Sequence, residues 1–441
     1  MNRPGPAITA IRSTQIVTPE GLLDGYVRMA DGRIADLGRG SVPGALDVGD
    51  RLVLPGFVDP HVHINEPGRT EWEGFSTATR AAASAGITTL VDMPLNSTPV
   101  TTTVRALEEK RHAAQGKLWV DVGLHAGVVP GNLADLQQLA TSGIVGAKAF
   151  MVDSGIPEFP PAGARDLEAA MRVLAKAGLP LLVHAELPQP APVEPGPDRR
   201  ALSGAARWAA SRPPSWEVEA LRLLIDLCRR TGCHTHVVHV ASSHCLPHLA
   251  KARAEGLPLT AETCPHYLFF ALGEFGDEDV RFKCAPPIRS RENASQLLDG
   301  LRAGLLDYVA SDHSPAPPAM KSGGFERAWG GISSLALGPS VLFTMHPEPR
   351  DLADWFATAP ARIMGLRDRG AIVQGLRADL VVFDPGKEGV IRESHLHTRH
   401  TVSPYLGKRL RGVAEMTFLA GRCVFDNGAF IGAPQGAIVY G

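Results

Sequence analysis

The sequence predicts an α/β protein, a (β/α)8 TIM barrel with a small β-sandwich domain built from both chain termini. Eight short apolar runs, each followed by a segment that could be helical, are spread over about 300 residues, which is the pattern of that barrel. Both ends of the chain instead show short strands and tight turns. The length of 441 residues also permits one large barrel and one small domain, since domains contain about 100–200 residues each.

The two ends of the chain carry the strand pattern of the small domain. Residues 8–17 and 26–38 alternate apolar and polar side chains near the N-terminus, with the turn pair Asp31-Gly32 between strands. Residues 370–385 and 413–430 do the same near the C-terminus. We therefore expect 1–54 and 368–441 to form one β domain and 55–367 to form the barrel.

The barrel prediction rests on the order of its segments. The apolar runs lie at 52–63, 86–94, 118–128, 143–151, 179–186, 235–242, 258–268 and 307–315. Residues 101–115, 166–178 and 217–232, between these runs, have the 3–4 spacing of amphipathic helices. A doubly wound open sheet is the alternative, but eight repeats favour closure. The Pro-rich stretch 187–204 after the fifth run is either a lid over the site or a plain surface loop.

Composition excludes several classes of protein. A formal charge of −2 gives no general attraction to nucleic acid or anionic membranes. The six cysteines show no CxxC spacing, which argues against a zinc ribbon or a disulfide framework and favours a reducing compartment. Neither a signal peptide nor a run of about 20 apolar residues is present, so we expect a cytoplasmic protein with no membrane span.

Metal-ligating side chains gather where the predicted strands end, at the face where barrels form their active sites. These residues are His61, His63, Lys148, His184, His239 and Asp312. Imidazole and carboxylate groups suit zinc or another first-row divalent ion. The two histidines of the HVH segment point to the same side of an extended chain, so both can reach one ion.

Other histidines are interpreted as structural. Those away from the strand ends are His112, His248, His346, His395 and His397. We prefer His239 to His234 and His236 as a ligand because it lies at the end of its apolar run, whereas they lie at the start. His125 ends the third run, and its position is as compatible with a role beside the ligands as with a structural one.

Lys148 is unusual for a metal site because a buried cation would repel metal ions. A neutral amine can instead add carbon dioxide and become a carbamate, whose two oxygens can bridge two ions. Asp312 and one hydroxide alone would not balance the charge of two divalent ions. Beside four histidines, a modified Lys148 is therefore the better interpretation than an exposed strand-end lysine.

These motifs resemble the amidohydrolase superfamily, in its cyclic-amidase branch of dihydroorotases, hydantoinases and allantoinases. Within the branch, the stretches 59–97, 261–268, 282–289, 311–315 and 328–335 are most similar to those of allantoinases. The HINEPGRTEWEGF and AWGGISSL segments are more specific than the shared metal motifs. One departure is the GAKAFM segment, where allantoinases commonly have a cysteine after the lysine.

The resemblance implies two divalent metal ions per subunit, held by the six residues named above, with Lys148 carboxylated. Zinc is the first expectation, with cobalt, manganese or iron as alternatives. A hydroxide between the ions would attack the ring amide, and Asp312 would move its proton to the leaving nitrogen. The expected reaction opens allantoin to allantoate, and relatives suggest a homotetramer.

Three polar residues are candidates for substrate binding. Dihydroorotases typically have an Arg two residues after HxH, matched to the substrate's carboxylate, whereas this chain has Asn65. Allantoin has no carboxylate, and its ureido group suits the amides of Asn65 and Asn96. Ser314, close to Asp312, is a third candidate. Arg69 is either an alternative anion clamp or structural, and Gly330 and Gly331 either admit backbone contacts to the substrate or form a turn.

Several alternatives stay open. A hydantoinase, a dihydropyrimidinase or a dihydroorotase would use the same metal site. A noncatalytic scaffold of the same fold is disfavoured because all six ligand positions are filled. A mononuclear deaminase is disfavoured because it needs no bridging Lys148.

Overall fold

An eight-stranded parallel sheet forms the centre of the computed structural model, which describes residues 8–189 and 202–441. Its strands are β6 (Phe57–Val62), β7 (Ile87–Asp92), β8 (Asp121–Gly127), β9 (Gly146–Phe150), β10 (Leu181–His184), β11 (Thr235–Val237), β12 (Leu259–Thr263) and β13 (Tyr308–Val309). They pair in chain order from β6 to β13. Residues of the first strand and of the segment after the last one also pair, in a bridge between Val62 and His313. The predicted succession of parallel strands is therefore confirmed.

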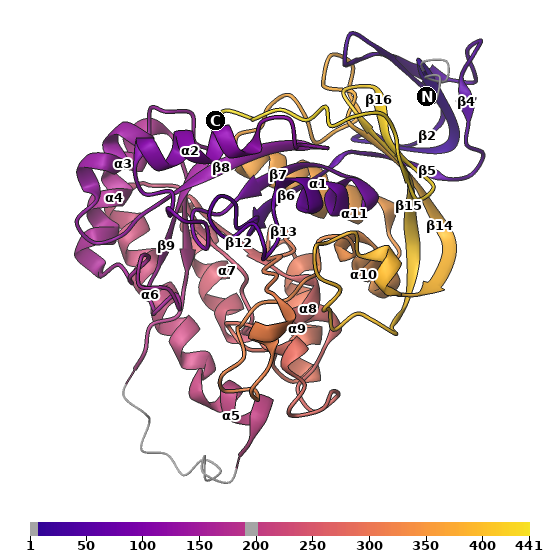
Figure 1. Cartoon of the computed structure of the whole chain (residues 1–441). Helices are drawn as coiled ribbons and strands as arrows, with labels where there is room; N and C mark the ends of the chain where they lie inside the picture. The colour runs from indigo at the N-terminus through magenta and orange to yellow at the C-terminus, as the bar shows by residue number, and fades with distance from the viewer. Residues whose placement is uncertain (1–7, 190–201) are drawn as a thin grey trace.

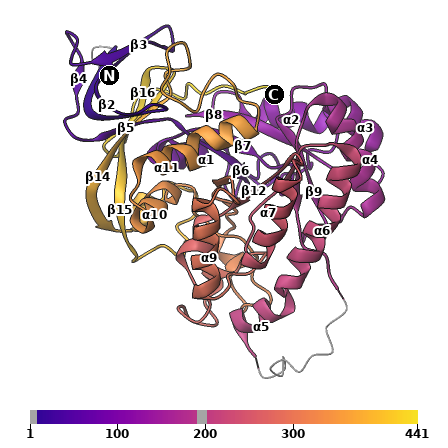
Figure 2. The same cartoon turned by 180° about the vertical axis from the view of Figure 1, so that it is seen from behind.

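Helices connect the strands and surround the sheet (Figures 1 and 2). They are α1 (Phe75–Ser84), α2 (Val104–Ala114), α3 (Leu133–Leu139), α4 (Ala164–Ala177), α5 (Gly204–Ser211), α6 (Pro214–Thr231), α7 (Leu246–Ala254), α8 (Pro265–Phe269), α9 (Arg291–Arg302), α10 (Gly338–Met345), α11 (Pro349–Ala353) and α12 (Ala359–Ile363). α4 shows why they form: Leu167, Ala170, Met171 and Leu174 lie on one buried face at helical spacing. Gly178, in the left-handed conformation, ends this helix.

Strands from both ends of the chain form a second, nine-stranded sheet beside the parallel sheet (Figure 1). Its members are β1 (Ala10–Thr18), β2 (Gly21–Ala30), β3 (Arg33–Arg39), β4 (Leu46–Asp47), β5 (Leu52–Pro55), β14 (Leu380–Val390), β15 (Arg409–Leu419), β16 (Arg422–Asp426) and β17 (Ala429–Phe430). The termini join where β5 pairs antiparallel with β14. Strands from both ends of the chain thus share one sheet, whereas the separate β-sandwich domain stays a prediction.

Two details differ from the expected organisation. The apolar run 52–63 contains two strands, because β5 belongs to the nine-stranded terminal sheet and β6 to the parallel sheet. Gly56 joins them, and a Cβ at this position would lie 2.3 Å from the Oγ1 atom of Thr88, so a larger residue would not fit. Beyond β17 the chain leaves the terminal sheet, and Ile438 pairs with Val122 of β8.

Most of the stretch 187–204, predicted as a lid or a surface loop, lies outside the described residues. Within the described part of the chain, none of the helices combines the length and the apolar character needed to cross a bilayer.

A buried ion pair supports the segment that follows β6. Asp92, at the end of β7, accepts hydrogen bonds from the backbone N–H of Ile64 (2.8 Å) and from Lys110 Nζ (2.6 Å). The side chains of Asp92 and Lys110 are 0% and 1% exposed. The pair therefore fixes the chain directly after His63 from within the protein.

We predict that Lys110→Met destabilises the fold, because it leaves the buried Asp92 carboxylate without a cationic partner. Removal of one partner from a buried ion pair costs about 3–5 kcal/mol. Urea unfolding would measure the loss, with exposed Lys176→Met as the control. A loss below about 1 kcal/mol, the range of exposed ion pairs, would contradict this assignment.

Candidate active site

The strand ends meet at a cavity of about 340 Å³. The cavity is lined by all six predicted ligands, His61, His63, Lys148, His184, His239 and Asp312. His61 belongs to β6, Lys148 to β9 and His184 to β10. His63, His239 and Asp312 lie one, two and three residues after β6, β11 and β13. None of the six is more than 8% exposed. The structure thus brings together the complete predicted set.

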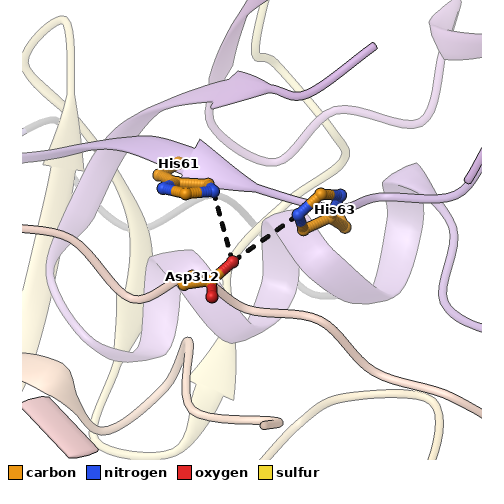
Figure 3. A group of neighbouring side chains, drawn as sticks. All are labelled: His61, His63 and Asp312. Atoms are coloured by element: carbon orange, nitrogen blue, oxygen red, sulfur yellow. Dashed lines mark ion pairs between the residues drawn. The ribbon is translucent and has the colours of Figure 1, made fainter. Parts of the chain in front are cut away.

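His61, His63 and Asp312 form the tightest part of the set. Both imidazole rings point towards the Asp312 carboxylate (Figure 3). Its Oδ1 atom lies 3.2 Å from His61 Nε2 and 3.5 Å from His63 Nε2. Burial alone would raise the pKa of Asp312, but the neighbouring His61 and His63 outweigh it and lower the pKa to about 2. An ionised carboxylate and two imidazoles at this spacing can hold one metal ion.

The other two histidines lie beside this group. The ring centroid of His239 is 4.5 Å from that of His184 and 5.4 Å from that of His61. Burial lowers the pKa of both His184 and His239, which keeps the rings neutral and available as ligands. The strand-end residue His239, rather than His234 or His236, lines the cavity, whereas those two contact Thr260.

Lys148 is fully buried, and its Nζ atom has no hydrogen-bond partner among the described residues. Burial lowers its pKa to about 8, although the charge of Asp312 acts in the opposite direction. A lowered pKa increases the fraction of Lys148 that is neutral, and the neutral amine is the form that reacts with carbon dioxide.

The donor set fits divalent metal ions. His61 Nε2, His63 Nδ1, His239 Nδ1 and Lys148 Nζ are all buried without a hydrogen-bond partner in the described structure. Such groups cost about 1–3 kcal/mol each when buried. A metal ion would satisfy the imidazole nitrogens, and the combination of imidazoles with a carboxylate is typical of zinc and similar ions.

Carboxylates behind the cavity orient two of these histidines, and sequence reasoning did not identify them. Glu262, on β12, lies 2.5 Å from His61 Nδ1 and 3.2 Å from His236 Nε2. Glu186 accepts a hydrogen bond of 2.6 Å from His184 Nε2. Both carboxylates are fully buried. A usable signal was present, since each is an acidic residue at or just after an apolar strand run.

The local backbone is strained where the site is built. His239 and Asp312 have φ angles of 42° and 44°, in a left-handed region that is unfavourable for residues other than glycine. Asn65 and Asn96 also have positive φ angles, of 66° and 68°. Backbone strain of this kind is common at functional sites, and it persists only where the surrounding structure holds the unfavourable conformation.

The predicted substrate-binding residues divide into two groups. Asn96 and Ser314 line the cavity. Asn65 does not belong to the lining, and its Nδ2 atom donates a hydrogen bond of 3.4 Å to the carbonyl of Pro315. Arg69 donates to the carbonyl of Asn96 at 3.0 Å and lies over the Trp72 ring, which supports the structural interpretation.

Glycines and aromatic residues shape the rest of the cavity. Gly330 and Gly331 line it, and a Cβ at Gly331 would lie 2.4 Å from the carbonyl oxygen of Ser314. Trp208 and Trp329 also line it. Sequence reasoning did not single out either tryptophan, although Trp329 lies within the AWGGISSL segment.

His125 lies behind the cavity rather than in its lining. Its Nε2 atom is 3.1 Å from the carbonyl oxygen of Pro60, directly before His61. Burial lowers the pKa of His125 to about 3, so the ring is neutral. The contact is compatible with the predicted role beside the ligands.

A family model described as the amidohydrolase family matches residues 52–424. The chain belongs to this family. It is 41% identical over 426 residues to an allantoinase of Saccharomyces cerevisiae, an alignment that covers 95% of this chain and 92% of the relative. It is 42% identical over 438 residues to an allantoinase of Streptomyces avermitilis, with 97% and 98% of the two chains covered. The resemblance predicted from the sequence is confirmed.

Solved structures of related enzymes share the fold. An L-hydantoinase (dihydropyrimidinase) from Arthrobacter aurescens superposes with a TM-score of 0.90 at 26% identity, with 99% of this chain and 100% of the relative covered. A D-hydantoinase superposes with a TM-score of 0.85 at 27% identity, with 98% of each chain covered. The parallel sheet and the terminal sheet therefore share the fold of these hydantoinases.

We predict that Lys148→Ala binds at least one metal ion fewer than the native chain and loses most activity, because the expected carbamate would have no amine on which to form. A short carboxylic acid added to this variant should partly restore turnover by occupying the space that the lysine side chain leaves. Metal analysis and turnover assays would measure both effects, with exposed Lys251→Ala as the control. A Lys148→Ala protein with the native metal content and near-native turnover would contradict the carbamate.

Proposed function

We propose that the protein is an allantoinase, which opens the hydantoin ring of allantoin by hydrolysis to give allantoate. The observation that carries this proposal is the identity of 41–42% to allantoinases over nearly the whole chain. The hydantoinase structures, at 26–27% identity, support the family and the fold rather than the substrate. All six predicted ligands line one cavity, which further disfavours a noncatalytic scaffold.

The cavity residues suit a pair of divalent ions. His61, His63, His184, His239 and Asp312 would hold the ions, together with Lys148 as a carbamate. The carbamate forms when the neutral Nζ atom bonds to the carbon of carbon dioxide and releases a proton. When bound, such ions polarise a carbonyl group and lower the pKa of water so that it attacks near neutral pH. Zinc is the first choice, and cobalt, manganese and iron suit the same donors.

Asp312 is the residue of this chain that moves the proton. Its carboxylate is ionised, since its pKa is about 2, and it lines the cavity. It accepts the proton of the attacking water and then donates it to the ring nitrogen as the amide bond breaks. One carboxylate thus acts first as base and then as acid.

Polar side chains around the cavity bind the ureido group and the ring amide. Asn96 and Ser314 provide an amide and a hydroxyl group in the lining, and neither carries a charge. Asn65 stays a candidate through its buried Oδ1 atom, which has no hydrogen-bond partner in the described structure. Asn96 and Ser314 would not neutralise a substrate carboxylate, and neutral allantoin needs no such partner. The cations of the lining are Arg212, Lys283 and Arg327.

We extend the proposal to the organisation of the protein. Residues 55–367 would act as the closed catalytic barrel, while 1–54 and 368–441 would form a β-sandwich domain. Cyclic-amide hydrolysis needs no nucleic acid or membrane partner, and a cytoplasmic homotetramer is the proposed assembly.

The test compares specificity constants for allantoin, hydantoin and dihydroorotate with one metal-loaded preparation. We expect allantoin to be favoured over dihydroorotate by at least about 10²–10³-fold, because the candidate binding residues Asn96 and Ser314 offer a substrate carboxylate no charge and the relatives of 41–42% identity are allantoinases. Preference for hydantoin or dihydroorotate would overturn the proposed substrate.

We predict that Asp312→Asn lowers kcat by about 10²–10⁴-fold, because the amide can neither accept nor deliver the proton. KM should change much less than kcat. Steady-state kinetics at a measured metal content would test this prediction. A higher KM with native kcat would place the proton shuttle elsewhere.

We predict that Asn96→Gly raises KM for allantoin by roughly 10-fold, the value of one neutral hydrogen bond, and changes kcat little. Glycine tolerates the φ angle of 68° at this position, so the substitution removes the amide without adding backbone strain. Asn427→Gly is the matched control, since Asn427 also has a positive φ angle of 44° but lies in an exposed turn. Native KM in Asn96→Gly would exclude this side chain from substrate binding.

A further inference from the structure

Glu186 joins a cavity histidine to an arginine. Its Oε2 atom accepts a hydrogen bond of 2.6 Å from His184 Nε2 and a second, short one from Arg212 Nη1. The Glu186 side chain is 0% exposed and that of His184 is 4% exposed. The three groups therefore form a buried chain that runs from the cavity wall to the junction of α5 and α6.

The hydrogen bond fixes which nitrogen of His184 faces the cavity. An ionised carboxylate can only accept, so Nε2 carries the proton and Nδ1 is left with its lone pair. The Phe150 ring stacks on the His184 ring at 4.6 Å between centroids, and the His239 ring meets it edge-on at 4.5 Å. With Glu186 at one nitrogen and aromatic rings against two sides, the orientation of His184 is determined.

Arg212 holds the carboxylate in this position. It follows α5 directly, and its guanidinium lies 4.8 Å from the centroid of the Trp208 ring, on the same helix. Its side chain is 14% exposed and lines the cavity. Without this cation Glu186 would be a buried anion whose remaining oxygen, Oε1, already has no hydrogen-bond partner in the described structure.

We propose that Glu186 and Arg212 are positioning residues that hold His184 with Nδ1 towards the cavity and thereby set the metal affinity of the site. This inference rests on the metal-dependent hydrolysis proposed above. A carboxylate behind a ligating histidine fixes its tautomer and raises its basicity, and loss of such a partner costs about 10–100-fold in metal affinity or activity.

The test measures metal affinity by titrating metal-free protein with zinc. In Glu186→Ala we expect one ion to bind about 10–100-fold more weakly. Glu186→Gln keeps an oxygen that accepts from His184 Nε2, so it should retain most of the native affinity. Arg212→Met should fall between the two, because Glu186 remains but loses its cation.

Asp121→Asn is the matched control for loss of a buried ion pair. Asp121 is the first residue of β8, at the opposite end of the strands from the cavity, and its Oδ2 atom lies 3.1 Å from Arg369 Nη1. We expect this variant to be less stable to heat and to bind zinc with native affinity. If Asp121→Asn weakened zinc binding as much as Glu186→Ala does, the loss of affinity would reflect general destabilisation of the protein and the proposal would be wrong.

Cobalt provides a second measurement should Glu186→Ala fail to fold. The visible spectrum of cobalt-loaded Glu186→Gln should differ from that of the native protein, since the neutral amide makes His184 a weaker donor. Identical spectra for Glu186→Gln and the native protein, or native zinc affinity in a folded Glu186→Ala, would overturn the proposal and leave allantoin hydrolysis intact. A native chain that binds zinc but does not open allantoin would remove the proposed substrate and leave this inference in place.

Discussion

The burial of nitrogen atoms without a hydrogen-bond partner at the ends of the parallel strands is the constraint on which the rest of the site depends. Among the residues that the structure describes, His61, His63, His239 and Lys148 each bury such an atom. A buried polar group without a partner opposes folding by about 1–3 kcal/mol. Metal ions bound to these nitrogen atoms would offset this cost, because a ligand that binds only the folded state stabilises it.

Acidic residues around the cavity keep these groups in place. Asp59 accepts from the backbone N–H of His61 and of Ser311, at 3.2 Å each, and so joins β6 to the segment after β13. Glu262 holds His61 from behind. The same carboxylates that fix the ligands therefore also connect the first and last strands of the parallel sheet. Folding of this sheet and formation of the site are coupled for this reason.

The sequence was sufficient for those features that depend on local pattern. Apolar runs with polar ends located the parallel strands, and the six ligand candidates chosen at their ends all line the cavity. Lys148 could be singled out because a lysine inside an apolar strand is chemically exceptional. Helices such as α4 and α6 followed from their 3–4 spacing.

The missed features depend on contacts between distant segments. Arg212 and Glu186 are 26 residues apart in the chain, so no local sequence pattern indicates that they form an ion pair. Asn65 was chosen by its distance from HVH, but its left-handed backbone directs the side chain towards Pro315 instead. The division of the run 52–63 between two sheets was also hidden, since both halves are equally apolar.

The central claim is that the buried donors hold two ions in an enzyme that opens a cyclic amide. Stepwise addition of zinc to metal-free protein, with allantoin turnover followed at each step, tests this claim most directly. We predict that activity rises until two equivalents per chain are bound and then stays constant. Full activity at one equivalent, or turnover that does not respond to zinc, would contradict the binuclear site and the role of Lys148 as its bridge.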